Sequence, residues 1–253
     1  MHQKDNDLVL YEQAGAVAII TLNRPEAYNA LSKDLVKQLI VCFNTAENDD
    51  TVHAIVLTGN GKAFSAGVDL KELSHDSSTL IDDSAFVTMF NGNKKPVIGA
   101  INGFAITGAL ELALNCDVLY ASENAVFADT HSKVGIMPTW GMSQKLPRLI
   151  GMARAKEMSL SGRKIDAKTA LDWGLINRIY PSDKLLEKTI ELAKEISAND
   201  PKVVKGMKEL MDSCNGKDLK DAIAIEYKTS HLHNDNLDYS GMLEKLNQLK
   251  KTK

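Results

Sequence analysis

The sequence places one carboxylate inside an apolar stretch. Glu111 lies in INGFAITGALELALNCD, residues 101–117, which the apolar pattern predicts to be helical near residues 107–115. An unpaired buried carboxylate costs several kcal/mol and is normally neutralised or expelled. Glu111 is therefore either a structural carboxylate hydrogen-bonded to nearby backbone or a general acid/base whose proton affinity is shifted by its surroundings.

Two glycines favour the second interpretation. Gly108 stands at the expected first turn of this helix, where backbone N–H groups have no intrahelical acceptor and attract an oxyanion. Gly67 permits an unusual backbone in the turn SAGVD, and the amide of Val68 follows it. Two such N–H groups that converge on one oxygen would form an oxyanion hole for the enolate of a thioester. Glu111 would then be placed to move a proton at the adjacent carbon.

Other motifs in the sequence predict neither a metal nor a nucleotide. The glycine-rich turn GNGKAF, residues 59–64, lacks the spacing of a phosphate-binding loop. His231 and His233 lie in a polar segment without other candidate ligands, so a solvated helix face is the better interpretation. Three cysteines far apart in the chain are expected to be incidental thiols in a reducing compartment, namely Cys42, Cys116 and Cys214.

The elements that must position these residues follow an α/β pattern. β-branched runs closed by glycine alternate with helical patterns over the first 140 residues, which predicts parallel strands. After about residue 140 the sequence predicts a nearly all-helical region, whose apolar faces must be buried on the core or on a neighbouring subunit. Strands are expected within 8–22 (two, around Gly15), 53–59, 96–103, 117–122 and 125–129, and helices over 31–49, 144–162, 165–175, 183–199, 201–213 and 217–234.

The composition is that of an ordinary globular protein. The chain has 253 residues, 44% of them hydrophobic, and a net charge of −3. Without an excess of basic residues, binding to nucleic acid or to an anionic membrane surface is not expected. The N-terminal residues contain no apolar run typical of a signal sequence, and the longest uncharged stretch, 15 residues from 96 to 110, is too short to span a bilayer. A cytoplasmic location is therefore predicted.

Four segments of the chain together resemble the enoyl-CoA hydratase/isomerase (crotonase) superfamily. They are RPEAYNAL (24–31), AIVLTGNGKAFSAGVDLKEL (54–73), KPVIGAINGFAITGALELALNCD (95–117) and SLSGRKIDAKTALDWGLINRI (159–179). The similarity runs from about residue 8 to residue 200. It implies a spiral core of ββα units over residues 1–195, strand-rich to about residue 140. It also implies a helical region over 196–253 that closes the site and trimerises, often into a hexamer.

The resemblance further implies an acyl-CoA ligand and no separate cofactor. Val68 and Gly108 match the two oxyanion-hole positions of the family, and Glu111 matches the first of its two catalytic glutamates. Arg24 and Lys71 are candidate cations for the phosphates of CoA, with solvated surface charges as the alternative. Substrate contacts are implied by the same matching for Arg24, Ala27, Ala66, Asp69, Leu70 and Lys71.

The sequence departs from the family at the second catalytic glutamate. In hydratases of the family that glutamate lies 20 residues after the first, and the residue here is His131. Imidazole titrates near neutral pH and keeps acid/base capacity, although it changes the charge and reach of the group. We expect His131 to be the partner of Glu111, and the alternative is a loop residue that only lines the pocket. Asp129 ranks below His131 as a substitute carboxylate.

Two further departures concern the substrate. Trp140, in PTWG, stands where many hydratases have a small glycine-rich turn, and its ring would narrow the acyl site. A short or slim acyl group is therefore expected. Met242 and Leu246 stand where relatives more often carry an aromatic residue and an arginine, so the family's CoA contact from this tail is not predicted.

The leading hypothesis is syn addition of water to a trans-2-enoyl-CoA through an enolate held in the oxyanion hole, with Glu111 as principal base. Within the family the alternatives are double-bond isomerisation, thioester hydrolysis and decarboxylation, because one carboxylate is enough to shuttle one proton. The alternative to an enzyme is an acyl-CoA-binding protein that has lost catalytic activity through the change at position 131. A homo-oligomer, a trimer or a dimer of trimers, is expected in each case.

Overall fold

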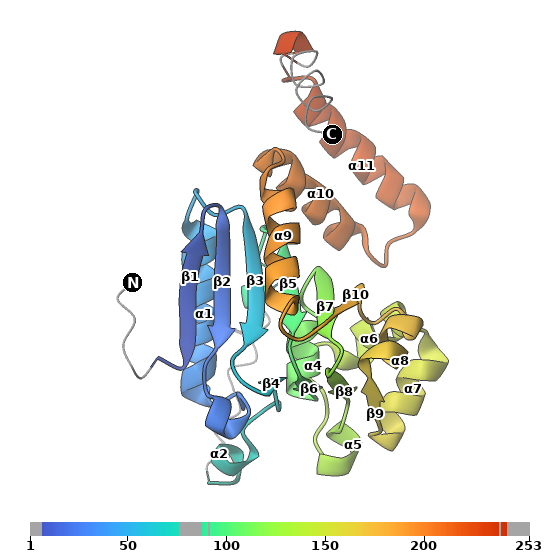
Figure 1. The fold of residues 1–253 in the computed structure, drawn as a ribbon. Helices are drawn as coiled ribbons and strands as arrows, with labels where there is room; N and C mark the ends of the chain where they lie inside the picture. The colour runs from blue at the N-terminus through green and yellow to red at the C-terminus, as the bar shows by residue number, and fades with distance from the viewer. Residues whose placement is uncertain (1–6, 76–87, 91, 238, 242–253) are drawn as a thin grey trace. The chain divides into compact units, whose positions relative to one another are not determined.

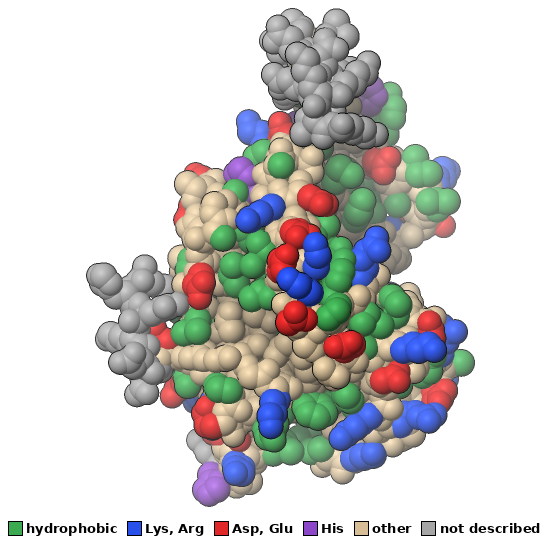
Figure 2. All heavy atoms as spheres, viewed as in Figure 1, with side chains coloured by type: hydrophobic (Ala, Val, Ile, Leu, Met, Phe, Trp, Pro, Cys, Tyr) green, Lys and Arg blue, Asp and Glu red, His purple; other side chains and the backbone are tan. Residues whose placement is uncertain are grey.

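The computed structural model describes residues 7–75, 88–90, 92–237 and 239–241 (Figure 1). The chain divides into two compact units, residues 1–205 and 206–253. Both sheets lie in the larger unit, and the described part of the smaller unit is helical. On the face drawn in Figure 2, Lys and Arg side chains are interspersed with Asp and Glu, so no single stripe of positive charge covers that face.

The first sheet has six strands and is mostly parallel. Its first two strands form an antiparallel hairpin that turns at Gly15, where φ is +66°. All other strand pairs in the sheet are parallel, as the alternating sequence pattern predicts. In spatial order the strands are β1 (Val9–Ala14), β2 (Val17–Leu22), β3 (Ala54–Gly59), β5 (Val97–Ile101), β7 (Val118–Ser122) and β10 (Arg178–Tyr180).

Both faces of this sheet are buried because its strands are apolar on both sides. Ile20 and Leu57 belong to the main core, which also holds the apolar face of α1 (Lys33–Asn48). Their chain neighbours Ile19 and Val56 point to the opposite face and pack in a second core with α9 (Leu185–Ser197). The continuous apolar runs in the sequence therefore correspond to strands covered on both faces (Figure 1).

A smaller, four-stranded sheet carries the ends of the ββα units. Each unit places one strand in the first sheet, the next strand in the second sheet and then a helix: β3–β4–α2, β5–β6–α4 and β7–β8–α5. The predicted spiral of ββα units is therefore confirmed. The additional elements are β4 (Ala63–Ser65), β6 (Phe104–Ile106), β8 (Val126–Ala128), β9 (Lys164–Asp166), α2 (Leu70–His75), α4 (Gly108–Ala113) and α5 (His131–Val134).

The prediction that the chain is nearly all-helical after residue 140 is wrong in two places. β9 pairs antiparallel with β8, and β10 pairs parallel with β7, so residues beyond 140 complete both sheets. The helix expected over 165–175 begins later, as α8 (Ala167–Trp173), because Asp166 accepts a hydrogen bond from the Thr169 amide and caps it. The helix expected over 144–162 is two helices, α6 (Met142–Ile150) and α7 (Met152–Ser161), divided at Gly151.

The unit 206–253 contains most of α10 (Pro201–Cys214), which begins in the larger unit, all of α11 (Leu219–Asn234) and a 3₁₀ helix at Tyr239–Gly241. None of the described side chains of α11 is buried. Its apolar residues Leu219, Ile223 and Tyr227 recur every four positions and are 74%, 56% and 67% exposed. Among the described residues, no helix has both the length and the apolar composition needed to cross a bilayer.

Candidate active site

Three parallel strands of the small sheet end at the same edge, and a candidate segment follows each of them. β4 and β6 pair in parallel, and Ile106 at the end of β6 pairs with Ala128 at the end of β8. The carboxyl ends of parallel strands are where α/β folds form their ligand sites. The edge carries three segments, which are 66–69 after β4, 107–111 after β6 and 129–131 after β8.

The first two segments bring the predicted oxyanion-hole amides together. Gly67 has φ +92°, and a Cβ there would lie 2.6 Å from the carbonyl oxygen of Ile106, so the turn requires glycine. A Cβ built on Gly108 would lie 3.5 Å from the Val68 amide nitrogen. Within the described part of the chain, neither the Val68 nor the Gly108 N–H has a hydrogen-bond acceptor. Both amides thus keep a free donor, as an oxyanion hole requires.

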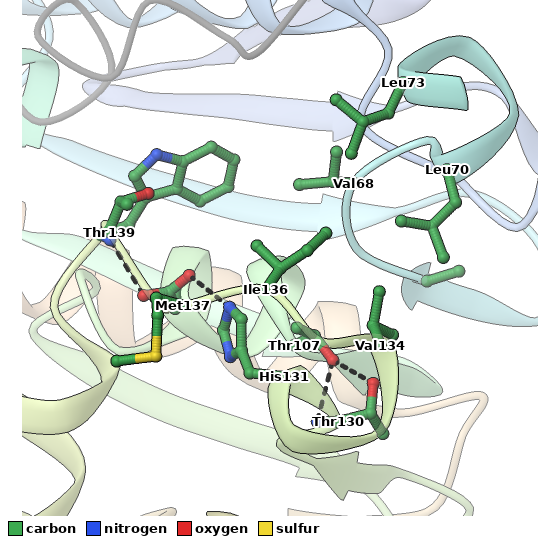
Figure 3. A pocket seen from close by; sticks show the side chains of 13 residues that line it. Val68, Leu70, Leu73, Thr107, Thr130, His131, Val134, Ile136, Met137 and Thr139 are labelled. Carbon is green, nitrogen blue, oxygen red and sulfur yellow. Dashed lines mark hydrogen bonds and ion pairs between the residues drawn. The ribbon is translucent and has the colours of Figure 1, made fainter. Parts of the chain in front are cut away.

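Sequence reasoning did not identify Thr107, which shapes this edge. Its φ of 54° and ψ of −109° are unusual for a residue other than glycine. The Thr107 and Thr130 hydroxyl oxygens lie 2.5 Å apart, and the Thr130 amide donates to the Thr107 hydroxyl at 3.0 Å (Figure 3). The pair joins segment 107–111 to segment 129–131. No sequence pattern marks a threonine for this conformation.

Glu111 is buried, with 2% of its surface exposed. One carboxylate oxygen, Oε1, accepts hydrogen bonds from the backbone amides of Trp140 at 2.9 Å and Met142 at 3.1 Å. Burial raises the pKa of this carboxyl, although the two amides and nearby His131 act in the opposite direction. Glu111 is therefore both held by backbone and shifted in proton affinity, so the two interpretations from sequence are compatible.

His131 lies between two carboxylates. Its Nε2 is 3.6 Å from Oε2 of Glu111, and its Nδ1 is 2.6 Å from Oδ1 of Asp129. Burial alone would raise the pKa of the Asp129 carboxyl, but hydrogen bonds from His131 and Ser159 hold this pKa below its usual value. The structure brings Asp129, His131 and Glu111 into one continuous row. The sequence ranks Asp129 below His131 as a substitute for the second glutamate. In the structure Asp129 contacts His131, and His131 is the residue that faces Glu111.

A small apolar cavity of about 90 Å³ opens over this row (Figure 3). The Trp140 side chain is buried, and its Cζ3 lies 3.1 Å from the position that a Cβ on Gly108 would take. Trp140 therefore packs directly beside Gly108 and narrows the cavity. The cavity is lined by Glu111, Thr107, Thr130, His131, the apolar residues Val68, Leu70, Leu73, Val134, Ile136, Met137 and Trp140, and also Ala66 and Thr139.

Comparison with known proteins assigns the chain to a family. The family model for enoyl-CoA hydratase/isomerase matches residues 12–249. The chain belongs to the enoyl-CoA hydratase/isomerase family. The resemblance seen in four sequence segments and the crotonase-type fold that it implies are thereby confirmed.

Individual relatives cover nearly the whole chain. A probable peroxisomal enoyl-CoA hydratase 1 of Arabidopsis thaliana is 36% identical over 240 residues, which is 94% of this chain and 89% of the relative. A short-chain-enoyl-CoA hydratase of Clostridium acetobutylicum is 38% identical, covering 86% of each protein. The crystal structure of an enoyl-CoA hydratase from Bacillus anthracis superimposes with a TM-score of 0.89 at 33% identity, covering 97% of each chain.

The structure places the residues that the family resemblance assigns to CoA in different electrostatic environments. Arg24 donates to Asp69 at 2.5 Å, and Asp69 in turn accepts from the Lys71 and Glu72 amides at the start of α2. Burial would raise the pKa of the Asp69 carboxyl, and these partners, Arg24 foremost, lower it overall. The Arg24 charge is thus balanced within the protein. Lys71 is exposed and has no salt bridge within the described residues.

The other matched positions lie around the same turn. Ala27, at the end of a 3₁₀ helix over Pro25–Ala27, is partly exposed, and Ala66 and Leu70 are exposed. Met242 and Leu246 lie outside the described residues. No group of three or more His, Cys, Asp or Glu side chains within the described ranges is arranged to hold a metal ion.

Proposed function

We propose that the enzyme adds water to a trans-2-enoyl-CoA. The observation that carries this proposal is the row Asp129–His131–Glu111 next to two unpaired amides. In this row Nδ1 of His131 lies 2.6 Å from Oδ1 of Asp129, and Nε2 of His131 lies 3.6 Å from Oε2 of Glu111. The thioester oxygen would accept the Val68 and Gly108 N–H groups, which polarises the conjugated double bond. The retained glutamate and the hydratase names of relatives at 36–38% identity support the same reaction.

In the proposed reaction, Oε2 of Glu111 takes a proton from water while the oxygen bonds to C3. The electron pair of the double bond moves to the thioester oxygen and forms the enolate. The proton on Glu111 then passes over 3.6 Å to Nε2 of His131, which makes the imidazole cationic. Nε2 gives this proton to C2 on the same face, and the electron pair returns from the oxygen, so both groups are restored. The overall change is the addition of one water.

The substrate would carry a short or slim acyl group, because the buried Trp140 ring narrows the cavity beside Gly108. Lys71 would meet a phosphate of CoA, and Arg24 would shape the turn through Asp69. We also propose that the helical region from residue 196 onward assembles with other copies of the chain, which would cover the exposed apolar face of α11. Light scattering of the purified protein measures this assembly.

The reaction is tested by incubating the protein with crotonyl-CoA and following the loss of conjugation and the product mass. The expected product has gained one water. Solvent-deuterium incorporation without that gain, using enoyl-CoA substrates, would indicate isomerisation instead, and release of free CoA would indicate hydrolysis. Binding of CoA esters with no chemical change would contradict an enzymatic function altogether.

A further inference from the structure

Asp129 is the first residue after β8 and is 2% exposed. Its Oδ1 accepts two hydrogen bonds from the same residue, from Nδ1 of His131 at 2.6 Å and from the His131 backbone amide at 3.2 Å. The Ser159 hydroxyl lowers the pKa of this carboxyl further. Several donors therefore compensate the cost of burying an ionised carboxylate.

Asp129 does not contribute to the lining of the cavity over Glu111, whereas His131 and Thr130 do. It instead lines a neighbouring cavity of about 500 Å³ together with Met142 and Ser159. Its carboxylate therefore cannot act on a substrate carbon held above the row. Apart from the effect of its charge on the pKa of Glu111, any contribution of Asp129 to the chemistry passes through the imidazole.

We propose that Asp129 is a positioning residue that fixes the proton on Nδ1 of His131 and thereby directs Nε2 toward Glu111 and the substrate. A carboxylate acts only as an acceptor, so a bond at 2.6 Å requires that Nδ1 is the donor. The second bond, from the His131 backbone amide, sets the orientation of the carboxylate itself. This inference rests on the proposed hydration for its effect on rate, but not for its effect on the tautomer.

Asp129 also stabilises the charged form of the imidazole. Hydration as proposed passes through a cationic imidazole, and an ionised carboxylate at 2.6 Å stabilises that cation. An amide in the same place removes the charge and can donate its own N–H to Nδ1, which favours the wrong tautomer. Asp129→Asn is therefore a nearly isosteric change that disturbs only charge and tautomer.

The kinetic test is a double-mutant cycle with crotonyl-CoA. Asp129→Asn is expected to lower kcat by roughly 10²-fold with KM nearly unchanged, since the residue does not touch substrate. In a His131→Gln background the same change should lower kcat by less than about 3-fold, because the route through the imidazole is already lost. Asp166→Asn is the matched control, since it removes a carboxylate that only caps α8. Equal losses in both backgrounds, or a small loss in the first, would overturn the proposal.

The direct test is ¹⁵N NMR of the histidine side chains in the unmodified protein, with the His131 signal assigned by its loss in His131→Gln. A protonated Nδ1 is expected, and in folded Asp129→Asn the neutral ring should shift toward protonation at Nε2. An unprotonated Nδ1 in the unmodified protein would overturn the inference even if Asp129→Asn does not fold. If the protein hydrates no enoyl-CoA, the proposed function fails while this measurement still decides the role of Asp129.

Discussion

Segments 107–111 and 129–131 follow neighbouring parallel strands and begin in register, yet they supply opposite kinds of chemistry. The first offers backbone amides and a carboxyl whose pKa burial raises. The second offers an imidazole and a carboxyl whose pKa is lowered by its hydrogen bonds, against the effect of burial. The two buried carboxyls on either side of one ring thus differ in proton affinity, because burial outweighs the hydrogen bonds at Glu111, whereas hydrogen bonds from His131 and Ser159 outweigh burial at Asp129. Environment, and not residue type, separates their roles.

Removing the proton acceptor of the first segment is expected to have the largest effect. Glu111→Gln should keep the hydrogen bonds from the Trp140 and Met142 amides and lower kcat for crotonyl-CoA by roughly 10³-fold. The exposed Glu123→Gln serves as control. Unchanged turnover in Glu111→Gln would show that the row does not perform the chemistry.

The second segment is predicted to matter less. His131→Gln removes the ring that lies between the two carboxylates and should lower kcat by roughly 10²-fold, because Glu111 and the two amides of the proposed oxyanion hole remain. Steady-state rates with crotonyl-CoA measure the loss, with the exposed Lys133→Gln as control. A loss of less than about 3-fold would indicate that His131 only lines the cavity.

The amide side of the first segment can be tested without touching an ionisable group. A Cβ in Gly108→Ala would lie 3.1 Å from Trp140 Cζ3 and 3.2 Å from Val68 Cγ2, and so would crowd the space between the two amides. We expect kcat to fall about 10-fold, less than for loss of a whole donor. Gly206→Ala, where a Cβ meets nothing within 4 Å, is the control. Equal activity in both variants would contradict the assigned hole.

The contribution of Lys71 lies outside both segments and should be smaller. Lys71→Ala is expected to raise KM for crotonyl-CoA by about 3-fold at low ionic strength and less in high salt, because exposed charges are screened. The corresponding pantetheine thioester, which lacks the distal phosphates, should show no change. A similar rise in Lys62→Ala would mean that the effect is not specific to this turn.

The raised pKa of Glu111 predicts a small effect on stability with a defined sign. In the folded protein this carboxyl holds its proton above the unfolded value of about 4.3, so unfolding releases a proton there. The wild-type protein therefore loses stability as pH rises from about 4.3 through the folded pKa, and Glu111→Gln escapes this loss. The melting temperature of the variant relative to wild type should increase between pH 4 and pH 7. A constant difference would show that burial does not shift this group.

The apolar pattern of the sequence was sufficient for the strands of the large sheet up to β7 and for the buried carboxylate of the candidate site. Long apolar runs predict β2, β3, β5 and β7, and a lone charge in an apolar helix identifies Glu111. The three-residue strands β9 and β10 are too short to show a periodic pattern and depend on pairing with β8 and β7. Tertiary contacts decide them, not local preference.

Contacts between residues far apart in the chain could not be predicted from the sequence either. Arg24 looks like a free cation until the fold brings Asp69, 45 positions away, to its guanidinium. The unusual backbone of Thr107 follows from the junction of β6 with α4, and its side chain gives no sign of it. The partnership of Asp129 with His131 needs only two residues of spacing, but the 3.6 Å approach of Nε2 to Glu111 depends on a segment from another part of the fold.

The bond between the Thr107 and Thr130 hydroxyls has a consequence for how such an enzyme can change over time. The backbone at residue 130 is anchored through Thr107, by contacts that do not involve the side chain at 131. A substitution there alters the proton-transfer group while its attachment point stays in place. Position 131 can thus accept a different chemistry in a single mutational step, and an engineer could use the same anchor to install one.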